Sequence, residues 1–308
     1  MKKTLSLSAL FVSITFFASA QKEYKLQYSF KKGDIYDWSQ SASVKQHIAG
    51  PGFDQNIETT VKASALMKII ELTPKGAKFE IEYTKLSTSN SQANIQMDSE
   101  GDTTKNLPNK IMRAMKGQKF NFTLTKDGAV ESVENDENLW AGLTAANGFK
   151  DAQVGPMKQA LQNSFGKNSI KGSLETAMIK YPENKIKVGL SWNNKNEVGT
   201  PIPLKTDNVW TLESAEDPAA VVVGDGKIAT TDTTKVVTLP QGFKATTNFK
   251  GRRVIKSQVN LSTGWPETSK AYAEQKGFMV LLAGGQIPED MKMDMEVNVD
   301  SEYTIKKK

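Results

Sequence analysis

His47 is the single histidine of the 308-residue chain, so any imidazole chemistry would depend on it. A serine triad would need it as the general base. It lies in a polar, strand-like stretch, and no G-x-S-x-G elbow accompanies it, so we expect a surface histidine. Ser164 and Lys167 match the S-x-x-K pattern of serine–lysine enzymes, but the K-T-G partner motif is missing and Gly166 interrupts the helix that such a pair needs. Cysteine is absent, which excludes thiol nucleophiles and thiolate metal sites.

Carboxylates are the other groups whose spacing could do chemistry, either as acid–base pairs or as calcium ligands. Glu80 and Glu82 point the same way from a predicted strand, whereas glycosidase carboxylates usually come from different elements. A second acidic group near the C-terminus contains Asp290, Asp294, Glu296 and Asp300. Calcium needs about six to eight converging oxygens, and these acids are spread along a strand. Asp225 and Asp232, placed on a loop with a predicted turn at 224–226, are no better. We interpret all of them as solvated surface.

Aromatic and methionine side chains are the candidates for contact with an apolar ligand. Aromatic residues in strands commonly serve the core, and core packing is the first interpretation for the five tryptophans Trp38, Trp140, Trp192, Trp210 and Trp265. Methionine adapts to irregular ligands, although it also fills cores. Methionine-rich apolar faces are predicted around Met112, Met115, Met291, Met293 and Met295.

The first twenty residues predict where the protein goes. Two lysines precede an apolar stretch at 5–17, and small residues end that stretch at Ala20, which is the layout of a cleaved signal peptide. We therefore expect a signal peptide over 1–20, cleavage between Ala20 and Gln21, and a soluble protein exported to the periplasm or the exterior. The stretch is shorter than the roughly twenty residues that span a bilayer, and no transmembrane segment is expected in the mature chain. No cysteine follows the cleavage site, so a lipoprotein is not expected.

Charge and motifs argue against nucleic-acid and nucleotide partners. The formal charge of +6 falls to +4 when two signal-peptide lysines are removed (6 − 2), and the remaining lysines are interleaved with acids. A nucleic-acid surface needs clustered basic residues, and only Arg113, Arg252 and Arg253 are arginines. Neither a Walker motif nor G-x-G-x-x-G is present. We expect no cofactor, no metal and no nucleic acid.

Alternation of apolar and polar residues dominates both ends of the chain and predicts β-strands. It is present over 24–30, 61–69 and 79–83, and it is cleanest over 291–299, where methionine and valine alternate with polar residues. A hairpin is predicted around the turn at 126–128. Since each strand then has one solvated face, antiparallel sheets are favoured.

The middle of the chain shows helical spacing instead. Helices are predicted over 107–116, 136–146, 156–165 and 174–181. The order of strands, then helices with one hairpin, then strands is typical of segregated elements. We therefore expect an α+β, β-rich fold of mostly antiparallel curved sheet with a helical insertion in the middle of the chain.

A hint of internal repetition bears on domain organisation. Gly33 lies three residues before Tyr36, and Gly189 lies three residues before Trp192. A duplicated β unit explains this, and so does the ordinary use of glycine in turns and aromatics in strands. The expectation is one β-rich domain over 21–308, with the alternative of two pseudo-repeats, 21–135 and 183–308, flanking a helical segment at about 136–182.

Three short motifs occur in a familiar order: FKKGDIY at 30–36, KVGLSW at 187–192 and STGWP at 262–266. With them the chain resembles a family of exported Bacteroidota proteins that is catalogued as a domain of unknown function, the family numbered 6263. The resemblance spans nearly all of the mature chain. It implies export and a β-rich fold, and it brings no catalytic residues.

Three functions are compatible with these observations. The first is a non-catalytic protein of the cell envelope that binds a small apolar or amphiphilic ligand between curved sheet and helices. The alternative is a structural or protein-interaction protein whose partner is another envelope protein. A carboxylate-dependent hydrolase is the third, and one histidine with no cysteine and no catalytic motif makes it the weakest.

Overall fold

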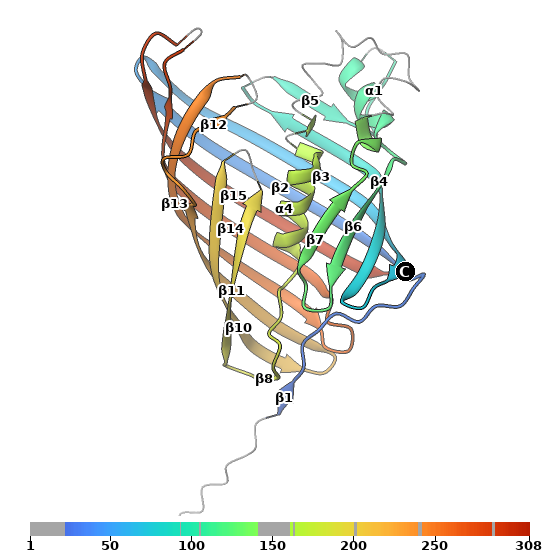
Figure 1. The fold of residues 1–308 in the computed structure, drawn as a ribbon. Coiled ribbons are helices and arrows are strands. Elements are labelled where there is room, and N and C mark those ends of the chain that lie inside the picture. The colour runs from blue at the N-terminus through green and yellow to red at the C-terminus, as the bar shows by residue number, and fades with distance from the viewer. Residues whose placement is uncertain are drawn as a thin grey trace, which may run out of the picture.

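The computed structural model describes residues 22–92, 94–104, 106–140, 161–162, 164–199, 202–239, 242–284 and 287–308. Nearly all strands of these residues join one 13-stranded antiparallel sheet (Figure 1). The prediction of a β-rich α+β fold with mostly antiparallel strands and helices in mid-chain is confirmed. Among the described residues, no helix is long and apolar enough to span a bilayer. The predicted signal peptide, with Ala20 and Gln21, lies outside them.

The two ends of the chain supply the two halves of the sheet. The N-terminal half contains β2 (Ile35–Gly50), β3 (Phe53–Leu72), β4 (Gly76–Asn90), β5 (Ile95–Asp98), β6 (Lys119–Thr125) and β7 (Val130–Glu134). The C-terminal half contains β9 (Ser191–Gly199), β10 (Pro203–Glu216), β11 (Ala219–Thr230), β12 (Val237–Thr238), β13 (Lys244–Asn260), β14 (Pro266–Leu281) and β15 (Met291–Lys307). A separate small sheet pairs β1 (Glu23–Tyr24) with β8 (Ile186–Lys187).

The halves meet in the centre, where the first long strand pairs with the last. The strand order is β7-β6-β4-β3-β2-β15-β14-β13-β11-β10-β9, with β5 added to β4 and β12 added to β13. The segments 21–135 and 183–308 therefore share one sheet. Their origin by duplication stays a prediction.

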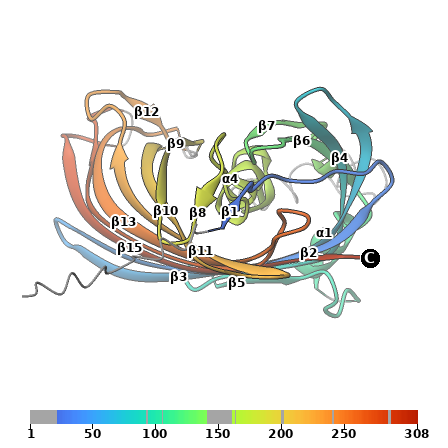
Figure 2. The same ribbon diagram turned by 90° about the horizontal axis from the view of Figure 1, so that it is seen from below.

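The sheet curves into a trough, and a helix occupies its concave side (Figure 2). The helix α4 (Lys167–Ala177) contacts both edge strands, β7 and β9, and also β14 in between. A second helix, α1 (Leu107–Ala114), packs beside β5 and β4. It confirms the helix predicted over 107–116, and the Asn106 side chain caps it by accepting a hydrogen bond from the backbone N–H of Asn109.

Aromatic residues fill the trough at the end nearest β1 and β8, which we call the closed end. Trp265 is 3% exposed, and its ring lies 4.4 Å from the ring of Tyr36 and 5.2 Å from that of Tyr28, centroid to centroid. Phe79 stacks on Phe122 at 4.7 Å. Buried aromatic pairs of this kind stabilise beyond their area alone, so this cluster anchors the fold.

The strand predicted over 24–30 pairs only at β1. Beyond Tyr24 the chain stays extended and alternates in burial, but it crosses the end of the trough outside the main sheet. The backbone N–H of Tyr28 donates to the carbonyl of Lys126, and that of Ser29 donates to the carbonyl of Thr263. Loop carbonyls therefore satisfy this backbone in place of a neighbouring strand.

The helix predicted over 174–181 has the wrong bounds. The observed helix begins at Lys167, immediately after Gly166, and ends at Ala177. Met178 is extended and residues 179–181 are non-helical. Tyr28 binds the backbone there: its hydroxyl accepts from the N–H of Ile179 at 2.9 Å and lies 3.2 Å from the carbonyl of the same residue. Of the helices predicted over 136–146 and 156–165, residues 138–140, 161–162 and 164–165 are helical, and the other parts are outside the described residues or non-helical.

The turn predicted at 224–226 is also wrong, whereas the hairpin turn at 126–128 is confirmed between β6 and β7. Residues 224–226 lie in the middle of β11. A Cβ on Gly224 would lie 2.6 Å from the ring of Trp210. Glycine occurs here because a neighbouring side chain packs directly on the backbone, a recognised use of glycine within strands.

Candidate ligand-binding site

The candidate catalytic residues lie apart from one another. His47 is on the outer face of the sheet, where its Nε2 lies 2.9 Å from Oδ1 of Asp54 and its side chain is 42% exposed. This confirms a surface histidine. Ser164 lies beside the concave cavity described below, while Lys167 is the exposed first residue of α4.

The acidic candidates form ion pairs on the outer face. Glu80 and Glu82 lie 2.8 and 3.7 Å from the ammonium of Lys119. Near the C-terminus, Asp294 pairs with Lys292 and Glu296 pairs with Lys276, each at 2.9 Å. No group of three potential metal-binding side chains occurs in the described part of the chain. Glu80, Glu82, Asp294 and Glu296 therefore lie on solvated strand faces, as interpreted from the sequence.

The tryptophans belong to the core, as predicted. Trp38, Trp140, Trp210 and Trp265 are each at most 9% exposed. Trp192 is half-buried and stacks on Trp210 with centroids 6.5 Å apart. None of them is among the described residues that line the concave cavity.

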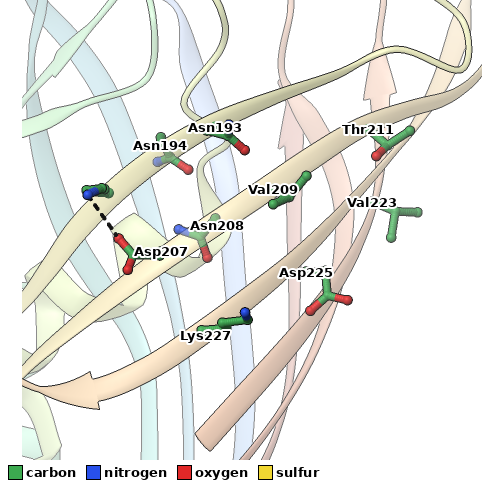
Figure 3. Close-up of a pocket in the computed structure, with 10 residues that line it drawn as sticks. Asn193, Asn194, Asp207, Asn208, Val209, Thr211, Val223, Asp225 and Lys227 are labelled. Atoms are coloured by element: carbon green, nitrogen blue, oxygen red, sulfur yellow. Dashed lines mark ion pairs between the residues drawn. The ribbon is translucent and has the colours of Figure 1, made fainter.

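A shallow depression lies on the outer face of β9, β10 and β11 (Figure 3). Its volume is about 700 Å³, and its lining is polar and charged apart from Val209 and Val223, with Asn208 as a buried member. Asp207 pairs with Lys195 at 3.8 Å, and Oδ1 of Asp225 accepts from Nε of Arg252 at 2.9 Å. Because its acids already have basic partners, we interpret this depression as ordinary solvated sheet surface.

A second cavity lies on the concave side, between α4 and the sheet. Its volume is about 680 Å³. The helix contributes small polar residues, among them Gly172, Ser173 and Thr176. The floor comes from eight long strands and the short β5, and it mixes small apolar with neutral polar residues, including Ala42, Val44, Gln46, Val61, Ala271, Ala273, Gln275, Val299 and Ser301. An amphiphilic molecule would find partners for both its parts here.

A buried cation lies in the wall of this cavity. Arg253 on β13 is 8% exposed, and its Nε donates to Oδ1 of Asn208 on β10 at 3.0 Å. The side chain crosses β11 at Gly226, where a Cβ would lie 2.3 Å from Oδ1 of Asn208 and 3.0 Å from Cγ of Arg253. Glycine at this position therefore makes room for the arginine.

Burial weakens the proton affinity of this guanidinium without removing its charge. Loss of solvent lowers the pKa of Arg253 to about 10, opposed by Tyr303 and by Glu175 on α4. Burial likewise raises the pKa of Glu175, against the opposite influence of Lys171. At neutral pH the cavity wall therefore carries a positive charge within a low-dielectric setting.

Methionines gather near β12, farther along the strands that line the cavity and outside its described lining. We call Met279, Met291, Met293 and Met295, together with Leu281, the methionine cluster. Met279 and Leu281 are buried, whereas the three methionines of β15 are only partly buried. The predicted methionine surface is thus present on β15. Met112 and Met115 are 0% exposed and belong to the closed core, so that part of the prediction is wrong. Met97, which lines the cavity, was missed.

Comparison with family models identifies the family of the chain. The model of a family of unknown function, DUF6263, matches residues 75–266, which is more than half of the chain. The chain belongs to this family. The matched region includes the second and third of the three sequence motifs, and the first, at 30–36, precedes it. The comparison with curated proteins returns no match for this DUF6263 protein.

Several solved structures show distant likeness to the DUF6263 chain. Lipovitellin, in a structure concerned with lipid–protein interactions, matches 88% of this chain with 11% identity and a TM-score of 0.43, and the match covers 25% of lipovitellin. An outer membrane channel from Pseudomonas putida F1 matches 90% of this chain and 97% of its own length, with 7% identity and a TM-score of 0.23. OccK2 of Pseudomonas aeruginosa, in complex with glucuronate, gives 89% and 99% coverage, 6% identity and a TM-score of 0.22. The DUF6263 chain spans about a quarter of lipovitellin, and likeness at this level says nothing about ligands.

Sequence reasoning missed Arg253, although a signal for it exists. Arg252 and Arg253 are neighbours in β13. Since successive side chains of a strand point to opposite faces, one of two adjacent arginines must point inward. In this DUF6263 chain the inward one is Arg253, which alternates with Ile255 and Val259 on the buried face.

Proposed function

We propose that this protein is an exported, non-catalytic protein of the cell envelope that holds an amphiphilic ligand in the concave cavity. The observation that carries the proposal is the cavity itself, about 680 Å³ between α4 and the sheet. Pockets for small molecules commonly have volumes of about 300–1,000 Å³. Export rests on the signal-peptide pattern of residues 1–20.

The helix is adapted to leave this space open. Its buried residues Ile170, Leu174 and Ala177 pack into the core. Its other side presents Gly172, Ser173 and Thr176 to the cavity. Larger apolar residues at these positions would fill the space against the sheet. The small residues of α4 therefore support the view that the space is a binding cavity.

The chemistry of the lining supports binding over hydrolysis. Among the described residues that line the cavity, none is a carboxylate or a histidine. General acid–base catalysis needs such groups within hydrogen-bond reach of the substrate. The lining instead combines methyl groups with amides, hydroxyls and the guanidinium of Arg253, which suits a molecule that is part apolar and part polar.

Native mass spectrometry of the protein, purified gently from its own exported fraction, tests the proposal. We expect a discrete added mass that disappears on denaturation. The variant Ala273→Phe fills the floor of the cavity and should lose the added mass. Glu274→Phe places the same ring on the outer face of the same strand and should keep it.

A clean mass of residues 21–308, unchanged by gentle handling, would contradict the proposal. A stoichiometric multimer in the same spectrum would favour the alternative, a protein-interaction role. A chain that keeps residues 1–20 in the exported fraction would contradict the signal peptide.

A further inference from the structure

Three neighbouring side chains of β10 and β13 each have a buried polar atom without a hydrogen bond in the described part of the chain: Nη2 of Arg253, Nδ2 of Asn208 and Oγ1 of Thr206. The three side chains are 8%, 2% and 1% exposed. Arg253 and Thr206 line the cavity, and Asn208 is bonded to Arg253 behind them. Oε1 of Gln40, in the same lining, and Oε2 of Glu175 on α4 are two further buried atoms without a partner. Buried polar groups are nearly always bonded, so a cluster of exceptions calls for an explanation.

The geometry makes these groups donors. Oδ1 of Asn208 already accepts from Nε of Arg253, which directs the amide N–H₂ of Asn208 toward other partners. Arginine can only donate, and a threonine hydroxyl can donate as well as accept. Around Gly226, Asn208 and Arg253 approach within 2.3 and 3.0 Å of the position that a Cβ would take, and Cγ2 of Thr206 approaches within 3.1 Å. The three side chains therefore lie next to one another, with Asn208 and Arg253 flanking Gly226 in register on either side of β11.

The charge of Arg253 is not neutralised by an ion pair at this point. No carboxylate of the described residues lies within 4.0 Å of its guanidinium. Glu175 influences it from α4 and Tyr303 from β15, while Lys171 pairs with Glu175 at 3.6 Å. A buried cation that lacks a counter-ion is costly, and an anionic ligand would offset that cost.

The methionine cluster lies farther along the same strands. Arg253 and Thr247 belong to β13, and Thr247 is in register with Met279, which is in register with Met293. The separation of six residues (253 − 247) corresponds to roughly 20 Å at about 3.3 Å per residue. A flexible apolar chain of that length would reach from the arginine to the methionines.

We infer that Arg253, Asn208 and Thr206 bind the anionic head group of the amphiphile, a carboxylate or a phosphate, and that its apolar chain extends toward the methionine cluster. This inference rests on the proposed function and adds the chemical class and the orientation of the ligand. Charged oxygens suit the site because arginine binds carboxylate and phosphate through planar, charge-assisted hydrogen bonds.

Calorimetric titration of the mature chain with matched probes tests the inference. The probes are dodecanoate, dodecyl phosphate and dodecanol below their aggregation limits, with acetate and inorganic phosphate as anions that lack a chain. We expect the two anionic amphiphiles to bind roughly 10- to 100-fold more tightly than dodecanol. The stronger of the two identifies the head group, and the short anions should bind far more weakly than either.

Two variants test whether Arg253 and Asn208 cause the preference for anionic amphiphiles over dodecanol. Arg253→Met should remove this preference while dodecanol binding persists. Asn208→Asp keeps the shape of the side chain and gives the guanidinium a permanent counter-ion, so it should also remove the preference, even if Arg253→Met does not fold. Arg252→Met, on the outer face of the same strand, should leave all affinities unchanged.

The possible failures are distinguishable. Equal affinity for all three amphiphiles, or a preference that survives in both variants, would overturn the head-group assignment and leave the proposed function standing. Tight binding of acetate or inorganic phosphate alone would contradict the inference that the ligand is an amphiphile and would identify a site for free anions. Absence of binding by all three amphiphiles would overturn the proposed function together with the inference.

Discussion

The two ends of the trough are built from the same strands but differ in what covers them. On β15, Ile305 lies at the closed end and is 2% exposed, while Tyr303, 7% exposed, lies where the cavity begins. On the same face of the same strand, Met291, Met293 and Met295 lie toward the other end and are only partly buried. We call that second region, with the cavity and the methionine cluster, the open end.

The difference shows that apolar alternation and burial are separate properties. Alternation of residue types directs one face of a strand inward. Burial of that face further requires an element packed against it, and at the closed end the extended segment with Tyr28 and Phe30 performs that role together with Trp265. The closed end is thus fully covered, whereas the strand faces of the open end are only partly covered.

Removal of an aromatic ring from the closed end should have the largest effect on stability. Phe79→Ala deletes a ring that is 0% exposed and contacts Phe122 and Trp265. We expect the free energy of unfolding to fall by about 3–5 kcal/mol. Denaturant titration measures it. Met293→Ala at the open end should cost less than half as much, and equal losses would contradict the distinction between the two ends.

Addition of a ring should also affect stability differently at the two ends, with a loss at the closed end and little change in the cavity. Ala65 on β3 is 2% exposed in the closed core, and Ala65→Phe should destabilise the protein by about 1–3 kcal/mol or more through overpacking. Ala273→Phe projects into the cavity, where space exists, and should leave the melting temperature nearly unchanged. A comparable loss of stability in both variants would show that the cavity is closed in solution.

The hydroxyl of Tyr28 should contribute the next largest effect. It bonds to the backbone of Ile179, and burial raises the pKa of Tyr28, so the group stays protonated. Tyr28→Phe leaves the N–H of Ile179 without this partner, at a cost of about 1–3 kcal/mol. Phe30→Leu, which removes no hydrogen bond from the same segment, is a suitable comparison. An unchanged unfolding midpoint in Tyr28→Phe would show that water replaces the hydroxyl.

The smallest effect should appear in the pH dependence of stability. Because burial raises the pKa of Glu175 above its ordinary value of 4.5, the folded protein holds this proton more tightly than the unfolded chain does. Stability should therefore decline as pH rises from 4.5 through the raised folded pKa. Glu175→Gln should be more stable than the wild type at neutral pH and equal to it well below pH 4.5.

Thermal unfolding of both proteins across this range checks the sign. Glu183→Gln, on an exposed loop, serves as the control. A wild type that gains stability through the same window, relative to Glu175→Gln, would contradict the raised pKa.

Local patterns predicted the elements well because they depend on neighbouring residues. The alternation over 291–299 became β15, and the helical spacing over 107–116 became α1. The failures arose from contacts between distant residues. Tyr28 binds the backbone of Ile179 from a position about 150 residues away, in a segment that is not helical, and the ring of Trp210 requires glycine within β11, where the sequence predicts a turn.

The site was harder to predict for the same reason. The many methionines of the chain suggest faces for ligand contact, yet Met112 and Met115 pack in the core. Arg253 resembles any surface arginine in the sequence, and its burial depends on α4 and on three strands that meet only in the folded sheet. The pair Arg252 and Arg253 was the one local sign that a charge points inward.

The pairing of β2 with β15 has a consequence for how the molecule forms. The central seam of the sheet joins Tyr36 to Lys307, nearly the whole length of the chain apart. Contacts so distant in sequence make folding slow. Until the seventeen residues of β15 are available, β2 and β14 are both long strands with one unpaired edge, and such edges promote aggregation. A chain that lacks β15 would therefore expose two strand edges that can pair with other chains. Because β15 pairs with both β2 and β14, its addition removes both edges in one step.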